Sequence, residues 1–306
     1  MVPLTGRDRW ILRMLHEHRV LTTGQLAELA FPTPKIARRR LAILHDYRVL
    51  DRFRPLRTRG SAPSHWTLAP AGATVLAAEA ATSVRELGYN HQQTLAIAHS
   101  LHLTHTLGVN QWFTTLTTHH HDGDGRVVAW WSQTRCQRLW GDLARPDAFG
   151  RYTHTGLVLD FFLEYDLATT ALPRVAAKLH GYSELARTTG VITPVLLWMP
   201  TLLRESSARH AVAQTWARLP DPDAVPVATA AAELLASITD PSPADRVWLP
   251  LDTTETSRLR LHELAAVWPR RTGPGTDIDA EPSAATLGGQ VMLAPPPPHP
   301  PTLEGR

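Results

Sequence analysis

Apolar residues near the amino end recur with the three- and four-residue spacing of amphipathic helices. This spacing predicts a first helix around Trp10 to Leu15, and the pair Thr22-Thr23 supplies the cap of a second helix. The second helix is expected to end at Phe31-Pro32, because the residue before a proline leaves the helical region. A third helix is expected from Pro34 to Tyr47. The chain therefore begins with three short helices separated by tight turns.

The third predicted helix has an apolar face and a basic face. The apolar positions are Ile36, Ala37, Leu41 and Leu44. The basic positions are Lys35, Arg38 and Arg39, with Arg40 beside them. A short helix, a tight turn and a second helix with a basic outer face are the layout of a helix-turn-helix. The small side chain of Ala42 would let this face approach a groove closely.

Residues 50–68 predict two short strands around a tip that contains Gly, Pro and Ser. Four arginines lie on the first arm and the tip: Arg52, Arg54, Arg57 and Arg59. Apolar side chains are available to pack beneath them: Phe53, Trp66 and Leu68. A basic helix followed by an arginine-rich hairpin is typical of a winged helix-turn-helix, which places one helix in the major groove of DNA and a loop near phosphates or the minor groove. We therefore expect residues 1–81, closed by a helix over 70–80, to bind double-stranded DNA.

The alternative interpretation of these basic residues is a solvated helix face and a charged hairpin without a ligand. DNA binding is favoured because the helix and the hairpin are basic together. If about six of these groups contacted phosphates, the logarithm of the affinity would fall against the logarithm of the salt concentration with a slope of about −5.

Beyond residue 81, strands and helices alternate, which indicates an α/β domain with a mixed sheet. A linker and a long connecting helix, from Thr94 to about Thr118, are expected within 82–125, and the α/β domain over 126–268. From 269 to 306 the composition shifts to Gly, Pro, Thr and Asp and ends in Ala-Pro-Pro-Pro-Pro-His-Pro-Pro. This composition predicts a disordered tail with polyproline II character, for which a proline-recognising partner is one option.

The apolar run Leu157 to Leu167 carries three acids. Side chains alternate along a strand, so Asp160, Glu164 and Asp166 are expected on one face. Three carboxylates on an apolar face are costly unless positive charge lies among them. A hard cation such as Mg²⁺ would satisfy them, with Asp147 as a further ligand. The alternative is pairing with neighbouring arginines, namely Arg145, Arg151 or Arg174.

Lysine is rare in this chain, since Lys35 and Lys178 stand against a large excess of arginine. Lys178 is expected on the first turns of a helix over 173–188, close to the end of the acidic strand. Such a lysine could orient a metal-bound hydroxide or stabilise a developing negative charge.

Composition adds information about the cellular setting. The formal net charge is only +3, yet the pI is about 9.3 and the basic residues are unevenly placed. A single cysteine, Cys136, excludes an intramolecular disulfide, suggests a reducing cytosol, and is expected to be a small buried residue. No apolar signal segment occupies residues 1–10, and no run approaches the roughly 20 apolar residues of a membrane helix. A soluble cytoplasmic protein is expected.

The acidic segment resembles the PD-(D/E)xK nuclease-like superfamily. Pro146-Asp147 matches the Pro-Asp element, and Glu164-Tyr165-Asp166 stands where Glu-x-Lys is expected, with Asp166 in place of the lysine. Lys178 on the following helix would be a migrated lysine. The resemblance implies Asp147, Glu164, Asp166 and Lys178 as catalytic residues of a metal-dependent DNA endonuclease. It implies Asp147, Glu164 and Asp160 as ligands of Mg²⁺.

Taken together, both halves of the chain resemble the replication-relaxation family of plasmids and mobile elements. The segments that carry the resemblance include Leu21-Thr-Thr-Gly-Gln-Leu26, Arg38-Arg-Arg-Leu41, Val49-Leu-Asp-Arg-Phe53, Arg145-Pro-Asp147 and Asp160-Phe-Phe-Leu-Glu-Tyr-Asp166. The resemblance implies a DNA-binding accessory protein of replication or mobilisation with a nuclease-like second domain. A homodimer is a further option for its assembly. The alternative is a non-catalytic winged-helix regulator whose α/β domain serves dimerisation or partner binding.

Overall fold

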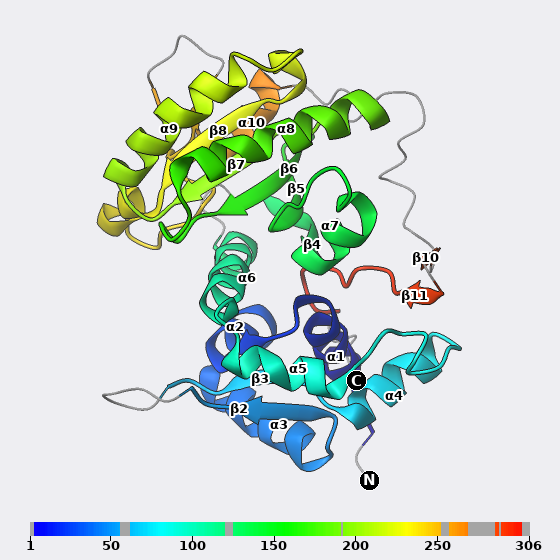
Figure 1. Ribbon diagram of the computed structural model, residues 1–306. Coiled ribbons are helices and arrows are strands. Elements are labelled where there is room, and N and C mark those ends of the chain that lie inside the picture. The colour runs from blue at the N-terminus through cyan, green and yellow to red at the C-terminus, as the bar shows by residue number, and fades with distance from the viewer. Residues whose placement is uncertain are drawn as a thin grey trace. The chain divides into compact units, whose positions relative to one another are not determined.

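The computed structural model describes residues 3–55, 62–119, 125–190, 192–251, 257–268, 285–287 and 289–301. The chain forms two compact units (Figure 1). The first unit comprises Met1–Thr114 and Ala280–Arg306, and the second comprises Thr115–Asp279. Each unit has its own sheet and its own helices, as the sequence predicts for a helical amino-terminal region followed by a mixed α/β region.

The first unit opens with helices and a small antiparallel sheet of strand order β1-β3-β2. The elements in chain order are α1 (Gly6–His18), β1 (Leu21–Thr22), α2 (Thr23–Ala30), α3 (Pro34–Asp46), β2 (Leu50–Phe53), β3 (His65–Leu68) and α4 (Pro70–Glu79). The three predicted helices and the two predicted strands of residues 50–68 are confirmed.

Local caps fix the starts of these helices. The Thr5 hydroxyl accepts a hydrogen bond from the Asp8 amide, and the Asp8 carboxylate accepts one from the Thr5 amide. Thr22 and Gln25 form the same reciprocal pair at α2. Thr33 caps α3, whose first residue is Pro34. These side chains satisfy amide groups that a helix leaves without partners at its amino end.

The core of this unit is built from the apolar stripes of α1 to α3 and from β3. Its buried side chains include Ile11, Leu15, Leu26, Leu41, Leu44, Trp66 and Leu68. The Trp66 indole donates a hydrogen bond to the Thr23 hydroxyl at 2.9 Å, so β3 is tied to the start of α2. The predicted packing of Trp66 and Leu68 beneath the hairpin is confirmed.

The connecting helix is divided rather than continuous. The structure has α5 (His91–Ala96), a 3-10 turn η1 (Ile97–His99) and α6 (Leu103–Thr118), so the prediction of one helix from Thr94 is wrong at its start. Ser100 adopts an extended conformation, and Leu101 is almost fully exposed. The division lets Ile97 and Leu103 both pack into a small cluster with Val20.

The second unit contains a six-stranded sheet of order β4-β5-β6-β7-β8-β9. Its elements are β4 (Arg126–Ser132), α7 (Gln133–Trp140), β5 (Ala148–His154), β6 (Leu157–Tyr165), α8 (Leu172–Thr189), β7 (Val195–Met199), α9 (Leu202–Trp216), η2 (Pro222–Ala224), β8 (Val227–Ala231), η3 (Ala232–Ser237), β9 (Leu249–Pro250) and α10 (Leu261–Val267). The β6–β7 and β7–β8 pairs are parallel and the other pairs antiparallel, which confirms the predicted mixed sheet.

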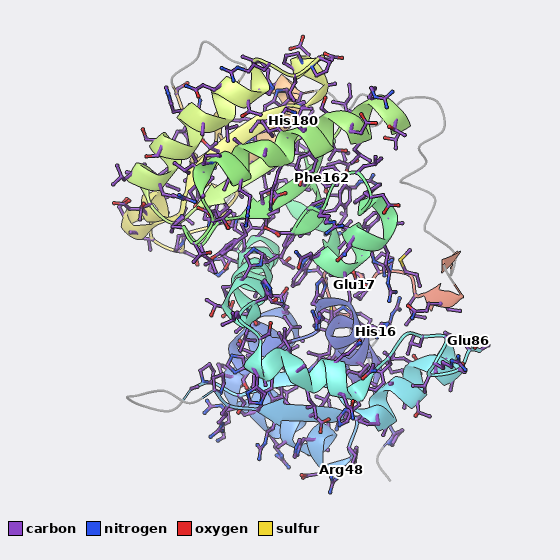
Figure 2. All side chains as sticks on the ribbon, viewed as in Figure 1. His16, Glu17, Arg48, Glu86, Phe162 and His180 are labelled. Carbon is purple, nitrogen blue, oxygen red and sulfur yellow. The ribbon has the colours of Figure 1, made fainter. Side chains whose placement is uncertain are left out.

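Helices cover both faces of this sheet. In Figure 1, α8 and α9 lie over one face and α10 lies behind the other. Phe162 belongs to the core under α8, whereas His180 of α8 points away from the sheet (Figure 2). Cys136 is fully buried in the same core, as predicted. Among the described residues, no helix is both long enough and apolar enough to cross a membrane.

The proline-rich tail is partly ordered. The short strands β10 (Ala285–Leu287) and β11 (Gln290–Met292) pair with each other, and residues 293–301 continue beside α1. The prediction of disorder over 269–306 is therefore wrong for residues 285–287 and 289–301, because the tail forms hydrogen bonds within itself and with α1 and Glu86. Residues 269–284 and 302–306 lie outside the described residues.

Candidate functional site

The outer side of α3 and the strand beside it carry exposed basic side chains. We call this set the basic surface, and its members are Lys35, Arg38, Arg39, Arg48, Arg52 and Arg54. In the part of the chain that the structure describes, no carboxylate forms an ion pair with any of them. Arg38 donates to the carbonyl of Pro34 at 3.1 Å, and Arg54 donates to the Ser64 hydroxyl at 2.9 Å. The basic surface therefore keeps its charge available to an external anion.

Arg40 does not belong to this surface, although the sequence pattern grouped it with the DNA-binding residues. Its guanidinium donates to both oxygens of Asp8, with 2.8 Å between Arg40 Nε and Asp8 Oδ1. The Asp8 side chain is almost fully buried. Burial opposes its charge, but hydrogen bonds from Arg40 and Thr5 and the charge of Arg40 outweigh it, so the pKa of Asp8 is lowered. Arg40 ties α3 to α1.

Ile36 lies on the exposed side of α3, although it was predicted to lie on the buried apolar face. It is 46% exposed on α3, whereas Ala37, Leu41 and Leu44 are buried as predicted. An apolar side chain thus stands on the same helix face as Lys35 and Arg39.

Sequence reasoning also missed Arg48. This residue follows α3 in a left-handed conformation, with φ of 59°, and it is exposed (Figure 2). Such a conformation is typical of glycine or asparagine after a helix, so the sequence gives no sign of it. Two further predicted DNA-binding residues, Arg57 and Arg59, lie outside the described residues.

The second candidate site lies where β5 begins and β6 ends. Asp147 immediately precedes β5, and the antiparallel register that pairs Ala148 with Leu163 places Asp147 opposite Glu164. One oxygen of Asp147 accepts a hydrogen bond from the Tyr165 amide at 2.8 Å. Both carboxyl groups are buried. The fold therefore brings together two acids that are separated in sequence.

Helix α8 provides the partners of Glu164. Lys178 donates to one oxygen and forms an ion pair, while the Tyr182 hydroxyl donates to the other oxygen. The Lys178 side chain is 40% exposed and that of Glu164 only 5%. We call Asp147, Glu164, Lys178 and Tyr182 the acid cluster. Lys178 is its solvent-facing member.

Burial and neighbouring charges shift the pKa values of three members of the acid cluster, Glu164, Lys178 and Tyr182. Burial and repulsion by Asp147 raise the pKa of Glu164 to about 7, against the opposing effects of Lys178 and Tyr182. Burial opposes the charge of Lys178, but Glu164 and Asp147 outweigh it and raise the pKa of Lys178. Burial and the nearby Glu164 raise the pKa of Tyr182 well above its ordinary value, so Tyr182 acts as a hydrogen-bond donor.

The other two predicted acids are held by arginines. Arg151, directly across the β5–β6 pair, donates to Asp160 at 2.5 and 3.0 Å. Arg204 of α9 donates to Asp166 at 2.6 and 3.3 Å. These two acids are therefore paired with arginines, which was the alternative to metal binding. Arg151 was among the predicted partners, whereas the sequence did not indicate Arg204.

The sequence model of the replication-relaxation family matches residues 12–196. This match spans more than half of the chain. The chain belongs to the replication-relaxation family. No curated protein and no solved structure matches it.

The replication-relaxation match encloses every described member of both candidate sites, from Lys35 of the basic surface to Tyr182 of the acid cluster. It leaves out residues 1–11, which include the first six residues of α1, and everything from residue 197 in β7 onward. The partly ordered tail is thus a feature of this chain outside the matched region.

The Mg²⁺ ligand set implied by the resemblance fits the structure only in part. Among the described residues, no group of three His, Cys, Asp or Glu side chains is arranged to hold a metal ion. Asp160 is engaged by Arg151, so the three-acid set of Asp147, Glu164 and Asp160 is not assembled. Asp147 and Glu164 remain adjacent, and two carboxylates are enough for Mg²⁺ when waters and phosphates complete its shell.

Proposed function

We propose that residues of the first unit form a winged helix-turn-helix that binds double-stranded DNA, and that the protein uses it in the replication or mobilisation of a plasmid or mobile element. Membership in the replication-relaxation family supports the cellular role. The arrangement of α2 and α3 beside the β1-β3-β2 sheet supports the module. In this module α3 enters the major groove, and Arg52 and Arg54 lie near the phosphates.

The observation that carries the proposal is the lack of carboxylate partners for the positive charges of the basic surface among the described residues. Elsewhere in the chain, arginines are commonly neutralised by acids, as at Arg151, Arg204 and Arg258. The arginines of the basic surface are instead exposed and have no carboxylate partner among the described residues, whereas Arg40 of α3 is paired with Asp8. A surface that carries several uncompensated positive charges attracts the phosphate backbone and gains affinity from the release of counterions.

The double substitution Arg38→Ala with Arg39→Ala tests this proposal. We expect at least tenfold weaker binding to duplex DNA in a gel-shift assay. We also expect a salt slope that is shallower by about 2, because two phosphate contacts are lost. Arg85→Ala is the matched control, since Arg85 is exposed in the same unit but lies between α4 and α5. Wild-type affinity and an unchanged salt slope in the double variant would exclude α3 as the binding helix.

A second candidate function is Mg²⁺-dependent hydrolysis of DNA phosphodiester bonds by the second unit. The specific support is the acid cluster, in which two buried acids face each other and a partly exposed lysine adjoins them. Asp147 and Glu164 would hold Mg²⁺, which supplies Lewis-acid stabilisation of a phosphate. Lys178 would place positive charge on the solvent side, where a negatively charged phosphate arrives. Tyr182 would hold Glu164 in orientation through its hydroxyl.

The contacts of the acid cluster are also explained by a purely structural role without catalysis. Lys178 and Tyr182 already satisfy both oxygens of Glu164, as expected for a non-catalytic regulator whose second unit only binds partners. Nicking of supercoiled plasmid in the presence of Mg²⁺, compared between the wild type and Glu164→Ala, separates the two functions. Equal nicking in both proteins, or none in either, identifies the regulator.

A further inference from the structure

The ordered part of the tail follows a defined path over the first unit. The amide of Val291 donates to the carbonyl of Glu86 at 2.7 Å, and Met292 is buried. The segment that follows, Ala294 to Pro301, consists of proline apart from Ala294 and His299. Figure 1 shows this segment, coloured red, beside α1. The proline-rich segment therefore packs against the unit of which it is itself a part.

Two donors on α1 engage the proline-rich segment through its backbone. Trp10 Nε1 donates to the carbonyl of Pro297 at 2.7 Å, and Arg13 Nη2 donates to the carbonyl of Ala294 at 3.2 Å. Both donors and both acceptors are three residues apart, in opposite directions along the chain. A polyproline II helix repeats every three residues and has no internal hydrogen bonds, so its carbonyls are free to accept from outside. Three residues span roughly 9 Å in a polyproline II helix but about 4.5 Å along α1, and the long Arg13 side chain bridges this difference to reach the Ala294 carbonyl.

Side-chain burial supports the same arrangement. Pro296 and Pro298 are buried, whereas Pro297 between them is exposed and offers its carbonyl to Trp10. Trp10 itself is 3% exposed. An indole that combines an apolar face with a single donor is the usual recognition element for proline-rich segments.

The groove extends beyond the residues that fill it. A pocket of about 540 Å³ remains beside the docked prolines, lined among others by Arg9, Glu79 and His299. Arg9 and Glu79 form an ion pair at 3.1 Å across α1 and α4. This rim provides polar groups and space for flanking residues of a longer ligand.

We propose that this face of α1 is a polyproline-binding groove that accepts a proline-rich segment of a partner protein, with the chain's own residues 294–301 as its resident ligand. The groove recognises backbone carbonyls and proline rings, both of which any polyproline II segment provides. The tethered tail competes at an effective concentration in the millimolar range, so a partner gains access when the tail is displaced. The proposal is independent of DNA binding, because Trp10 and Arg13 are not members of the basic surface.

The test uses the full chain and a fluorescein-labelled peptide with the sequence of residues 293–301. Pro296→Asp with Pro298→Asp releases the resident tail, because neither aspartate can be buried without cost. We expect this variant to bind the peptide at least tenfold more tightly than the wild type does, measured by fluorescence polarisation. Adding Trp10→Phe removes the indole donor and should weaken binding at least fivefold. Arg13→Ala, at a partly exposed position, is the alternative if Trp10→Phe fails to fold.

Peptide binding that is no tighter in a folded tail-released variant than in the wild type would overturn the proposal. So would binding that is insensitive to both Trp10→Phe and Arg13→Ala. Circular dichroism establishes folding, and the Trp10 indole resonance in a ¹⁵N spectrum should shift on tail release and return on peptide addition. A wild-type dimer in light scattering that the proline variant dissociates would assign the groove to the tail of a second copy and would also overturn the proposal.

Discussion

Glu164 is buried beside a second acid, and this position couples folding to pH. Its pKa is about 7 in the folded protein and close to 4.5 in the unfolded chain. Between these values the folded state binds the proton more tightly, so the free energy of unfolding falls as pH rises from about 4.5 to about 7.

We expect Glu164→Gln to lose this pH dependence, which is on the order of 1–3 kcal/mol for a shift of this size in a buried group. Glutamine retains acceptor capacity for Tyr182 but does not titrate. Urea unfolding at pH 5 and pH 8 measures the effect. Glu184→Gln, at a half-exposed position on α8, should behave like the wild type. A Glu164→Gln protein with the full wild-type pH dependence would show that another group is responsible.

Ile36 is an apolar residue on a basic helix face, and in the proposed DNA complex it lies near base edges. Apolar side chains at such positions contact the thymine methyl group. We expect replacement of one thymine by deoxyuridine, in a duplex selected from a random pool, to weaken wild-type binding about fourfold, since burial of one methyl group stabilises by about 0.8 kcal/mol. Ile36→Ala should be insensitive to the replacement. Lys35→Ala should weaken binding to both duplexes alike, and an Ile36→Ala protein that still discriminates would disprove the contact.

Contacts between residues that are far apart in the sequence could not be derived from local spacing. Arg40 pairs with Asp8, 32 positions away, so no property of α3 alone distinguishes it from Arg39. Asp147 faces Glu164 only because of the β5–β6 register, which periodicity does not specify. By contrast, the burial of Leu41 and Leu44 followed from local spacing and was predictable.

At the scale of elements, helix starts were predictable because their caps are local. Thr22 and the Thr33–Pro34 pair act within one turn, so sequence alone places them. The division between α5 and α6 was not predictable, since Ser100 and Leu101 are compatible with a helix and tertiary packing of Ile97 and Leu103 determines the path. The six-stranded order likewise depends on long-range pairing, although the alternation of strands and helices indicated its class.

The contact of α4 with the chain before β2 gives a prediction at this scale. A methyl group added at Gly72 would lie 2.3 Å from the carbonyl oxygen of Val49. We expect Gly72→Ala to destabilise by about 1–3 kcal/mol, because backbone atoms must move apart. Gly24 is a matched control in α2, where the nearest atom to an added methyl group is 3.7 Å away. Gly24→Ala should be neutral or stabilise by up to about 1 kcal/mol. Urea unfolding that shows equal effects for the two variants would contradict the close packing of α4.

At the scale of the whole molecule, the two candidate sites belong to different compact units. The basic surface lies within Met1–Thr114 and the acid cluster within Thr115–Asp279. Each unit has its own hydrophobic core, so a substitution in one is expected to leave the other folded. The proposed DNA binding and the proposed hydrolysis should therefore be separable by substitution.

For the candidate nuclease function, this separation predicts an asymmetric pattern in plasmid nicking. Glu164→Ala should retain wild-type affinity for duplex DNA but lose Mg²⁺-dependent nicking, because it alters only the acid cluster. Arg38→Ala with Arg39→Ala should lose both at low DNA concentration and regain nicking when the DNA concentration is raised, because the chemistry is intact and only delivery is weakened. Gel shifts and conversion of supercoiled to open-circular plasmid, measured over a DNA titration, check both statements. A Glu164→Ala protein that binds DNA tenfold more weakly would mean that the second unit contributes to DNA binding itself, and the division of roles between the units would then be wrong.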